Sequence, residues 1–206
     1  TNTSSATYAS WTFRKAAKFF DVVTYTGNGV LNATVGHGLG AAPRLIFVKS
    51  RSAAEPWIVL TTAINGSQDY GILSSTAAFA DDIVSATPTS TVFSISNGSA
   101  VNGNTSTYVA YCFAPVVGYS SFGSYTGNGG SQTIDCAFTT GARFVMIKRT
   151  DSTGDWYVWD SARGIVAGND PYLALNTSAA EVTSNDSVDT DNTGFVVNQV
   201  GASNIN

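Results

Sequence analysis

An internal repeat with a period close to 100 residues runs through this chain of 206 residues. Residues 25–29 and 125–129 both read Tyr-Thr-Gly-Asn-Gly, with five identities in five positions. Further matches join residues 44–49 to 143–148 at an offset of 99, and 73–78 to 175–180 at an offset of 102. Solenoid and propeller repeats are far shorter, so each copy should be a domain with its own core. The sequence therefore predicts two tandem modules.

When the two copies are aligned, one predicted strand at the start of the chain belongs to neither copy, and the second copy lacks its last strand. Residues 7–13 (TYASWTF) match residues 107–113 (TYVAYCF), which should form the closing strand of the first module. The corresponding strand of the second module is expected near position 210, past the last residue of the chain. We therefore expect an isolated closing strand and linker at 1–18, module one at 19–114, and module two, without its closing strand, at 115–206.

Short apolar runs that alternate with polar residues and end at Gly, Asn, Ser or Pro predict β-strands in both modules. The clearest are residues 45–48, 57–60, 92–95 and 108–113. Residues 75–84 are the best helix candidate. Such strands at intervals of about 10 residues indicate sandwiches or jelly rolls. The predicted fold is all-β, with two tandem antiparallel β-sandwich (jelly-roll-like) modules.

Low charge limits the classes of partner. Only 12% of the residues are charged, the net charge is −4, and 24 Ser with 25 Thr supply much of the polar surface. Without clustered Lys and Arg, nucleic acid is not an expected partner. No apolar run reaches the roughly 20 residues that cross a bilayer, so membrane insertion is not expected either. Cys112 and Cys136 lie in apolar surroundings and are predicted to be buried thiols, with one disulfide as the alternative.

The residues that carry catalysis are scarce. His37 is the single histidine, and its counterpart in module two is Cys136, so a turn residue is a simpler interpretation than a base. The two glutamates, Glu55 and Glu181, are not repeated between modules. The Thr-Gly-Asn-Gly segments follow a predicted strand and favour tight turns over anion cradles. We predict no enzyme activity, no catalytic residue and no cofactor.

Asp186, Asp189 and Asp191 form a run of oxygen ligands that could bind calcium. The run lacks the spacing and the closing glutamate of the calcium-loop motif. A solvated polar loop is therefore the preferred interpretation, and no metal site is predicted.

Trp57 and Trp156 occupy the same position in the two copies, which predicts that both are core residues. The opposite face of that strand carries Tyr157 and Trp159 in module two, next to Asp155 and Asp160. Aromatic faces flanked by carboxylates suit sugar rings, which offer apolar faces and hydroxyl edges. The residues expected to contact a glycan are Tyr157, Trp159, Asp155 and Asp160.

Three segments carry a family resemblance: residues 11–29 (WTFRKAAKFFDVVTYTGNG), 108–114 (YVAYCFA) and 145–158 (VMIKRTDSTGDWYV). With them, nearly the whole chain resembles a tandem repeat domain of tail-fibre-like structural proteins of aquatic (marine) tailed bacteriophages. The family pattern His-Asn-Leu-Gly-x-x-Pro reads HGLGAAP at residues 37–43, and module two departs from it altogether. The resemblance implies a viral protein located on the virion, with a structural or host-adhesion task and no established catalytic residues.

Three functions follow from these observations. The first is a non-enzymatic virion protein, part of a tail fibre or similar appendage, which contacts other virion proteins and a host-surface glycan and forms a homo-oligomer, a trimer by analogy. The second is a filament or capsid-decorating subunit in which residues 6–13, with Tyr8, Trp11 and Phe13, fill the vacancy in module two of another copy. In a simpler alternative, the chain is an excerpt whose own closing strand follows Asn206. The third is a polysaccharide depolymerase that would lose activity on changing Asp155 or Asp160 to Asn.

Overall fold

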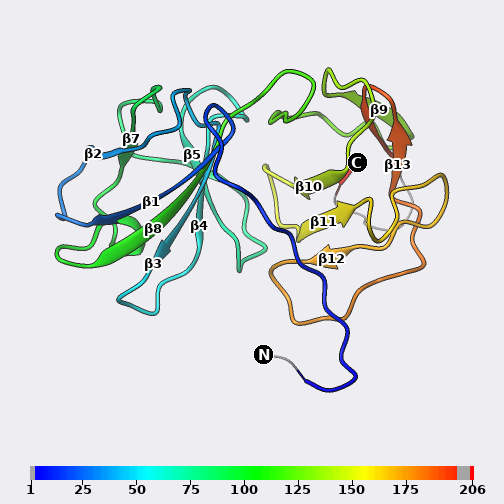
Figure 1. The fold of residues 1–206 in the computed structure, drawn as a ribbon, viewed down its shortest axis with the longest axis horizontal. Helices are drawn as coiled ribbons and strands as arrows, with labels where there is room; N and C mark the ends of the chain where they lie inside the picture. The colour runs from blue at the N-terminus through cyan, green and yellow to red at the C-terminus, as the bar shows by residue number, and fades with distance from the viewer. Residues whose placement is uncertain (1–2, 199–204) are drawn as a thin grey trace.

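The computed structural model describes residues 3–198 and 205–206, and it confirms the predicted all-β fold (Figure 1). Every strand pair in the described residues is antiparallel. Figure 1 shows two groups of strands side by side, β1 to β8 in one and β9 to β14 in the other. No helix in the described part of the chain has the length and apolarity that a membrane crossing requires.

The first group builds two layers around one core. A six-stranded sheet has the order β1-β8-β3-β4-β5-β6, and β2 pairs with β7 in a second sheet. The bounds are β1 Phe20–Thr26, β2 Ala33–Gly36, β3 Leu45–Ser50, β4 Ile58–Thr61, β5 Asp69–Ile72, β6 Ala80–Asp81, β7 Val92–Ile95, α1 Ser99–Asn102 and β8 Thr107–Phe113.

Period-two alternation directs every second side chain of these strands into the core. Ile46 and Val48 of β3 are buried, and they pack in one cluster with Phe93 and Ile95 of β7 and with Tyr108 of β8. The two sheets therefore enclose the apolar core of a β-sandwich.

The second group has two three-stranded sheets, with the orders β10-β11-β12 and β13-β14-β9. The bounds are β9 Gln132–Asp135, β10 Phe144–Lys148, β11 Trp156–Asp160, β12 Leu173–Ala174, β13 Val188–Asp191 and β14 Gly194–Val197. Val145 and Ile147 from one sheet and Val188, Phe195 and Val197 from the other share a second buried cluster.

Strand registers in the two groups lie at the offsets of the sequence repeat. The corresponding pairs are Ile46↔Leu60 with Val145↔Trp159, Ile58↔Ile72 with Tyr157↔Ala174, and Val35↔Phe93 with Ile134↔Phe195. These pairs differ by 99 or 102 residues on each strand, as do the matched sequence segments. That the two groups are copies of one unit, with boundaries at 18/19 and 114/115, stays an inference from the sequence.

The helix predicted over residues 75–84 is wrong. That segment is irregular except for the short strand β6, and α1 is the one α-helix in the described residues. The Phe79 N–H donates to the Thr150 carbonyl 3.0 Å away, and the Thr76 carbonyl accepts from the Gly154 N–H at 2.9 Å. These backbone groups bond to residues between β10 and β11 in the second group. They are therefore not available for the hydrogen bonds of a helix.

A buried tryptophan holds the two groups together. Trp156 at the start of β11 is 2% exposed, and its ring lies 5.5 Å from the ring of Phe79 between centroids. The Trp156 Nε1–H donates to the Ile72 carbonyl at 3.1 Å. Gly71 lies under both rings, where an added Cβ would stand 3.2 Å from the Trp156 ring. The joint between the two groups is therefore packed and hydrogen-bonded.

Candidate functional site

The edge of β10 is unpaired in the part of the chain that the structure describes. In the first module, the corresponding strand β3 lies between β8 and β4 and pairs with both. β10 pairs with β11 on one side, and no described strand pairs with its other side. Half of the backbone N–H and C=O groups of an edge strand point away from its single neighbour.

The segment before β9 also has no strand partner among the described residues. In the first module β1 pairs along its whole length with β8, from Phe20↔Phe113 to Thr26↔Thr107. Residues 121–128, which cover the corresponding part of the second module, form no strand. No described strand of the second group occupies the place that β8 has beside β1, so this segment has no strand partner in the part of the chain that the structure describes.

Residues 9–15 run in irregular structure and make no backbone–backbone hydrogen bond within the described residues. The Trp11 Nε1–H donates to Asp160 Oδ2 at 2.8 Å, and the Arg163 guanidinium carbon lies 5.5 Å from the Trp11 ring. Two of the three residues predicted for strand donation are exposed, Tyr8 at 60% and Phe13 at 43%. Side chains therefore hold this segment at the joint while its backbone stays unpaired.

Aromatic rings gather where the segment meets both modules. Phe13 lies 5.7 Å from Phe20, 5.3 Å from Phe113 and 6.3 Å from Phe144, measured between ring centroids. Phe20 and Phe113 are themselves 4.6 Å apart. These four residues, named here the phenylalanine cluster, join the start of β1, the end of β8 and the start of β10.

Asp160 anchors the Trp11 contact as a carboxylate. The Arg163 Nε lies 2.9 Å from Asp160 Oδ2, and Arg163 also pairs with Glu181 at 3.0 Å. Burial opposes ionisation of Asp160, but hydrogen bonds from Arg163 and Trp11 outweigh it and hold the pKa of this carboxyl below its usual value. The ionised Asp160 carboxylate thus holds Trp11 and Arg163 together at the start of the chain's contact with β11.

The face assignment made for β11 is wrong, and with it the predicted glycan contact. Tyr157 is 7% exposed and Trp159 is 0% exposed, both within the second core cluster. Asp155 accepts a hydrogen bond from Asn176 Nδ2 at 2.7 Å, and Asp160 is buried against Arg163. The rings thus face the core rather than a sugar. The shared position of Trp156 misled the assignment, because that residue is buried by the neighbouring module.

Trp57, the residue that corresponds to Trp156 in the sequence repeat, was also predicted to be a core residue. Trp57 precedes β4, is half-buried, and stacks on Tyr111 with 6.0 Å between ring centroids. In that strand Ile58 and Leu60 belong to the core cluster. The prediction that Trp57 is a core residue is therefore also wrong, because alternation directs its neighbours inward.

Each Tyr-Thr-Gly-Asn-Gly segment is held by an asparagine that the sequence analysis did not single out. Asn102 Oδ1 accepts from the Asn28 N–H at 2.8 Å, and Asn102 Nδ2 donates to the Val30 carbonyl at 2.9 Å. In the second module Asn206 Oδ1 accepts from the Asn128 N–H at 3.0 Å. The last glycine of each segment has a positive φ, 69° at Gly29 and 73° at Gly129. Both segments are irregular, and the N–H of Asn28 and of Asn128 is already engaged by a side chain.

The predicted turn at His37 is consistent with its contacts. His37 Nε2 lies 3.2 Å from the Thr89 carbonyl oxygen, and its ring stacks on Phe93 at 6.3 Å. The two cysteines are free thiols, as predicted, but only Cys112 is buried, whereas Cys136 is partly exposed. Burial raises the pKa of Cys112 to about 12, so this thiol is held in its unreactive form.

The structure brings together three carboxylates that are not the same set as the predicted run of Asp186, Asp189 and Asp191. One oxygen each of Asp170, Asp186 and Asp189 lies within 4.8 Å of the others. Asn198 Nδ2 donates to Asp186 at 2.6 Å and to Asp189 at 2.7 Å. Asp170 is fully buried, and burial raises the pKa of its carboxyl. Because hydrogen-bond donors already engage these oxygens, the cluster anchors a loop and gives no independent sign of a cation.

Asp191, the third residue of the predicted run, points elsewhere. Its Oδ1 accepts from the Thr193 N–H at 2.8 Å and from the Thr193 hydroxyl at 2.6 Å. Asp191 therefore caps the turn between β13 and β14.

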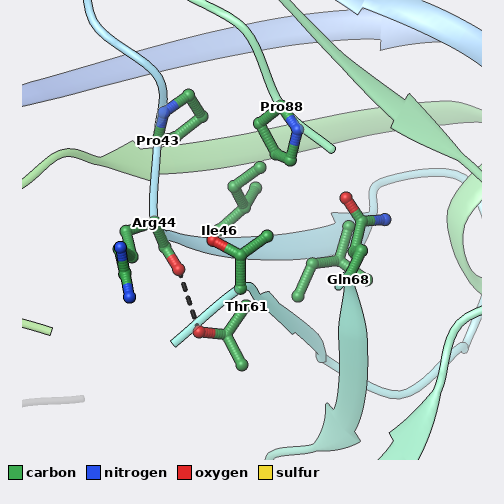
Figure 2. A pocket seen from close by; sticks show the side chains of 8 residues that line it. Pro43, Arg44, Ile46, Thr61, Gln68 and Pro88 are labelled. Carbon is green, nitrogen blue, oxygen red and sulfur yellow. Dashed lines mark hydrogen bonds between the residues drawn. The ribbon is translucent and has the colours of Figure 1, made fainter. Parts of the chain in front are cut away.

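A narrow crevice between β3 and β4 is lined by Pro43, Arg44 and Pro88 (Figure 2). Within it the Thr61 hydroxyl donates to the Arg44 carbonyl at 2.9 Å. Gln68 Oε1 is buried there without a hydrogen-bond partner among the described residues. The crevice itself leaves no room for a water-sized sphere, but an adjoining open cavity of about 280 Å³ shares Pro43, Arg44 and Pro88 with it and is also lined by Ala42, Thr62, Gly66, Thr87 and Pro115.

Fold and site together define an all-β protein of two joined antiparallel sandwiches, with one sheet edge unpaired in the described residues. The chain belongs to the family described as "Domain of unknown function (DUF7483)", whose model matches residues 1–206. No curated protein and no solved structure matches the chain.

Proposed function

We propose that the chain is a non-enzymatic structural protein of a bacteriophage virion, part of a tail fibre or similar appendage. The observation that carries this proposal is the joint at Trp156, which fixes two sandwich modules to each other through a buried ring and backbone hydrogen bonds. A spacer in an appendage must transmit position along its length, and a packed joint serves that task better than a flexible linker.

Surface chemistry supports an extracellular spacer. Charged residues make up 12% of the chain, and hydroxyl side chains replace them. Contacts built on hydroxyls and amides depend less on ionic strength than contacts between charges, which salt screens. The resemblance of residues 11–29 and 145–158 to tail-fibre repeat domains is the reason for proposing a location on the virion. A glycan contact through Tyr157 and Trp159 is not part of the proposal, because both rings are buried.

Immunogold electron microscopy tests the proposal. Antibodies raised against the chain should label the tail appendages of purified particles of the phage that encodes it. Mass spectrometry of those particles should detect peptides of the chain. Absence of the chain from purified particles would refute the virion role. A protein found on the capsid rather than the tail would favour the decorating subunit instead.

A further inference from the structure

The open cavity beside the crevice lies at the end of the first sandwich where four connecting segments meet. Its volume is about 280 Å³. Its lining includes Arg44 before β3, Thr62 after β4, Thr87 and Pro88 before β7, and Pro115 after β8. A volume close to the lower limit of the roughly 300–1,000 Å³ of ligand pockets suits one small ring. Loops at the end of a sandwich are a common place for binding residues.

A proline forms part of the wall of this cavity. In the second group of strands, Thr190 of β13 lies opposite Phe195 of β14. At the repeat offset of 102 the corresponding residue is Pro88, and β7 has no described strand on that side. Proline lacks the N–H that a strand donates to its neighbour, which disfavours a strand at this position. The first group therefore has a loop that lines a cavity where the second group has a strand.

Three polar groups of the lining residues have no hydrogen-bond or ion-pair partner in the part of the chain that the structure describes. They are the guanidinium of Arg44 and the hydroxyls of Thr62 and Thr87. The backbone of Arg44 is fixed, since its N–H donates to the Phe113 carbonyl at 2.8 Å and its carbonyl accepts from the Thr61 hydroxyl at 2.9 Å. The cavity thus offers one unpaired cation and two free hydroxyls, which complement a ligand that carries a carboxylate and hydroxyls.

A buried oxygen in the adjoining crevice adds one requirement. Gln68 is 4% exposed, and its Nε2 donates to Asp82 Oδ2 at 3.1 Å and to the Ser94 carbonyl at 3.2 Å. Its Oε1 has no donor among the described residues, and Figure 2 shows this oxygen on the side of the other residues that line the crevice. A buried acceptor without a donor is destabilising. The part of a ligand nearest the crevice should therefore carry a hydroxyl, which can donate.

We propose that this cavity binds a hexuronate, a six-membered sugar ring that carries one carboxylate. The carboxylate pairs with the Arg44 guanidinium, and ring hydroxyls exchange hydrogen bonds with Thr62 and Thr87. The apolar face of the sugar lies against the rings of Pro88 and Pro115, which removes apolar surface of both from water. A neutral sugar leaves the cation unpaired, and a simple anion leaves the hydroxyls unpaired. The inference deepens the proposed function and rests on it for the source of the ligand, an acidic polysaccharide on the host surface.

Titration of the ¹⁵N-labelled chain with D-glucuronate, followed by NMR, tests the proposal. The amide signals of Thr62, Gly66 and Thr87 should shift in a saturable way, with a Kd in the millimolar range expected for one ring with few contacts. D-glucose lacks the carboxylate, and acetate lacks the ring and its hydroxyls. Each of these two compounds should bind at least about tenfold more weakly than glucuronate.

Two variants and a matched control separate the contributions of the side chains. Arg44→Gln removes the cation and should weaken glucuronate binding by about tenfold or more. Arg51→Gln is the control, because Arg51 is also exposed but lies at the other end of β3, roughly 20 Å away. Thr87→Val replaces a hydroxyl by a methyl group and should weaken binding about two- to tenfold. All three positions are exposed, and urea unfolding checks that each variant keeps the fold.

Saturable shifts that Arg44→Gln weakens and Arg51→Gln leaves unchanged would support the proposal. It would be overturned if glucuronate gave no saturable shift at the cavity, or if Arg44→Gln bound it no more weakly than Arg51→Gln. Equal affinity for acetate or for glucose would overturn the assignment to a sugar acid. Failure of this titration leaves labelling of the phage particle intact, whereas absence from the particle leaves glucuronate binding intact, so the two proposals fail separately.

Discussion

Replacing Trp156 by alanine removes the ring that joins the two sandwiches. Fully burying a tryptophan takes roughly 200 Å² of surface from water, worth about 5 kcal/mol at about 25 cal/mol per Å² as an upper value. The Nε1–H bond to the Ile72 carbonyl adds about 1 kcal/mol. Part of this is recovered as Phe79 and its neighbours relax, so we expect Trp156→Ala to lower the free energy of unfolding by about 3–5 kcal/mol.

Trp57→Ala is the matched control, because the same residue at the corresponding position is half-buried and stacks only on Tyr111. Its expected loss is about 1–2 kcal/mol, since less surface leaves water and no joint is broken. Urea unfolding followed by circular dichroism measures both. We also expect Trp156→Ala to split one transition into two as the modules unfold separately. A loss no larger than that of Trp57→Ala, with one transition retained, would refute the assignment of Trp156 to the joint.

Two further predictions concern single polar side chains. Asn102→Ala removes three side-chain hydrogen bonds to Asn28 and Val30, so the free energy of unfolding should fall by about 1–3 kcal/mol in urea titrations; an unchanged midpoint would contradict this role. Asp69 lies opposite Asp81, and burial together with that carboxyl raises the pKa of Asp69 above its usual value. Ionised Asp69 destabilises the folded state. This cost is absent below the unfolded-state pKa of Asp69 and complete above its raised folded-state pKa. Asp69→Asn should therefore stabilise the protein by about 0.5–1 kcal/mol at pH 7 and have no effect at pH 3. Equal effects at both pH values would rule out this electrostatic origin.

Alternating patterns predicted the strands well, because burial on one face of a sheet leaves a direct mark on the sequence. The predicted strand at residues 92–95 is β7, and the one at 108–113 is β8 but for its first residue. These features depend on neighbours within one sandwich.

What the sequence did not reveal depends on contacts between sandwiches. Trp57 and Trp156 have matching sequence positions but different surroundings, because only one of them has a module packed on it. The faces of Tyr157 and Trp159 were inverted for the same reason. The hydrogen bonds that Asn102 and Asn206 make correspond to a weak sequence signal, the match between residues 99–102 (SAVN) and 203–206 (SNIN). This match is too short to stand out in a chain rich in Asn and Ser.

The position of the phenylalanine cluster has a mechanical consequence. The chain enters module one at Phe20 and leaves it at Phe113, and these two residues are directly paired. Tension applied along a fibre would therefore pull β1 and β8 apart from one end, breaking their hydrogen bonds one at a time. The rings of Phe13, Phe20, Phe113 and Phe144 lie at that loading point and must separate before the first of those bonds can open. Under such tension the cluster would hold the end of this strand pair closed.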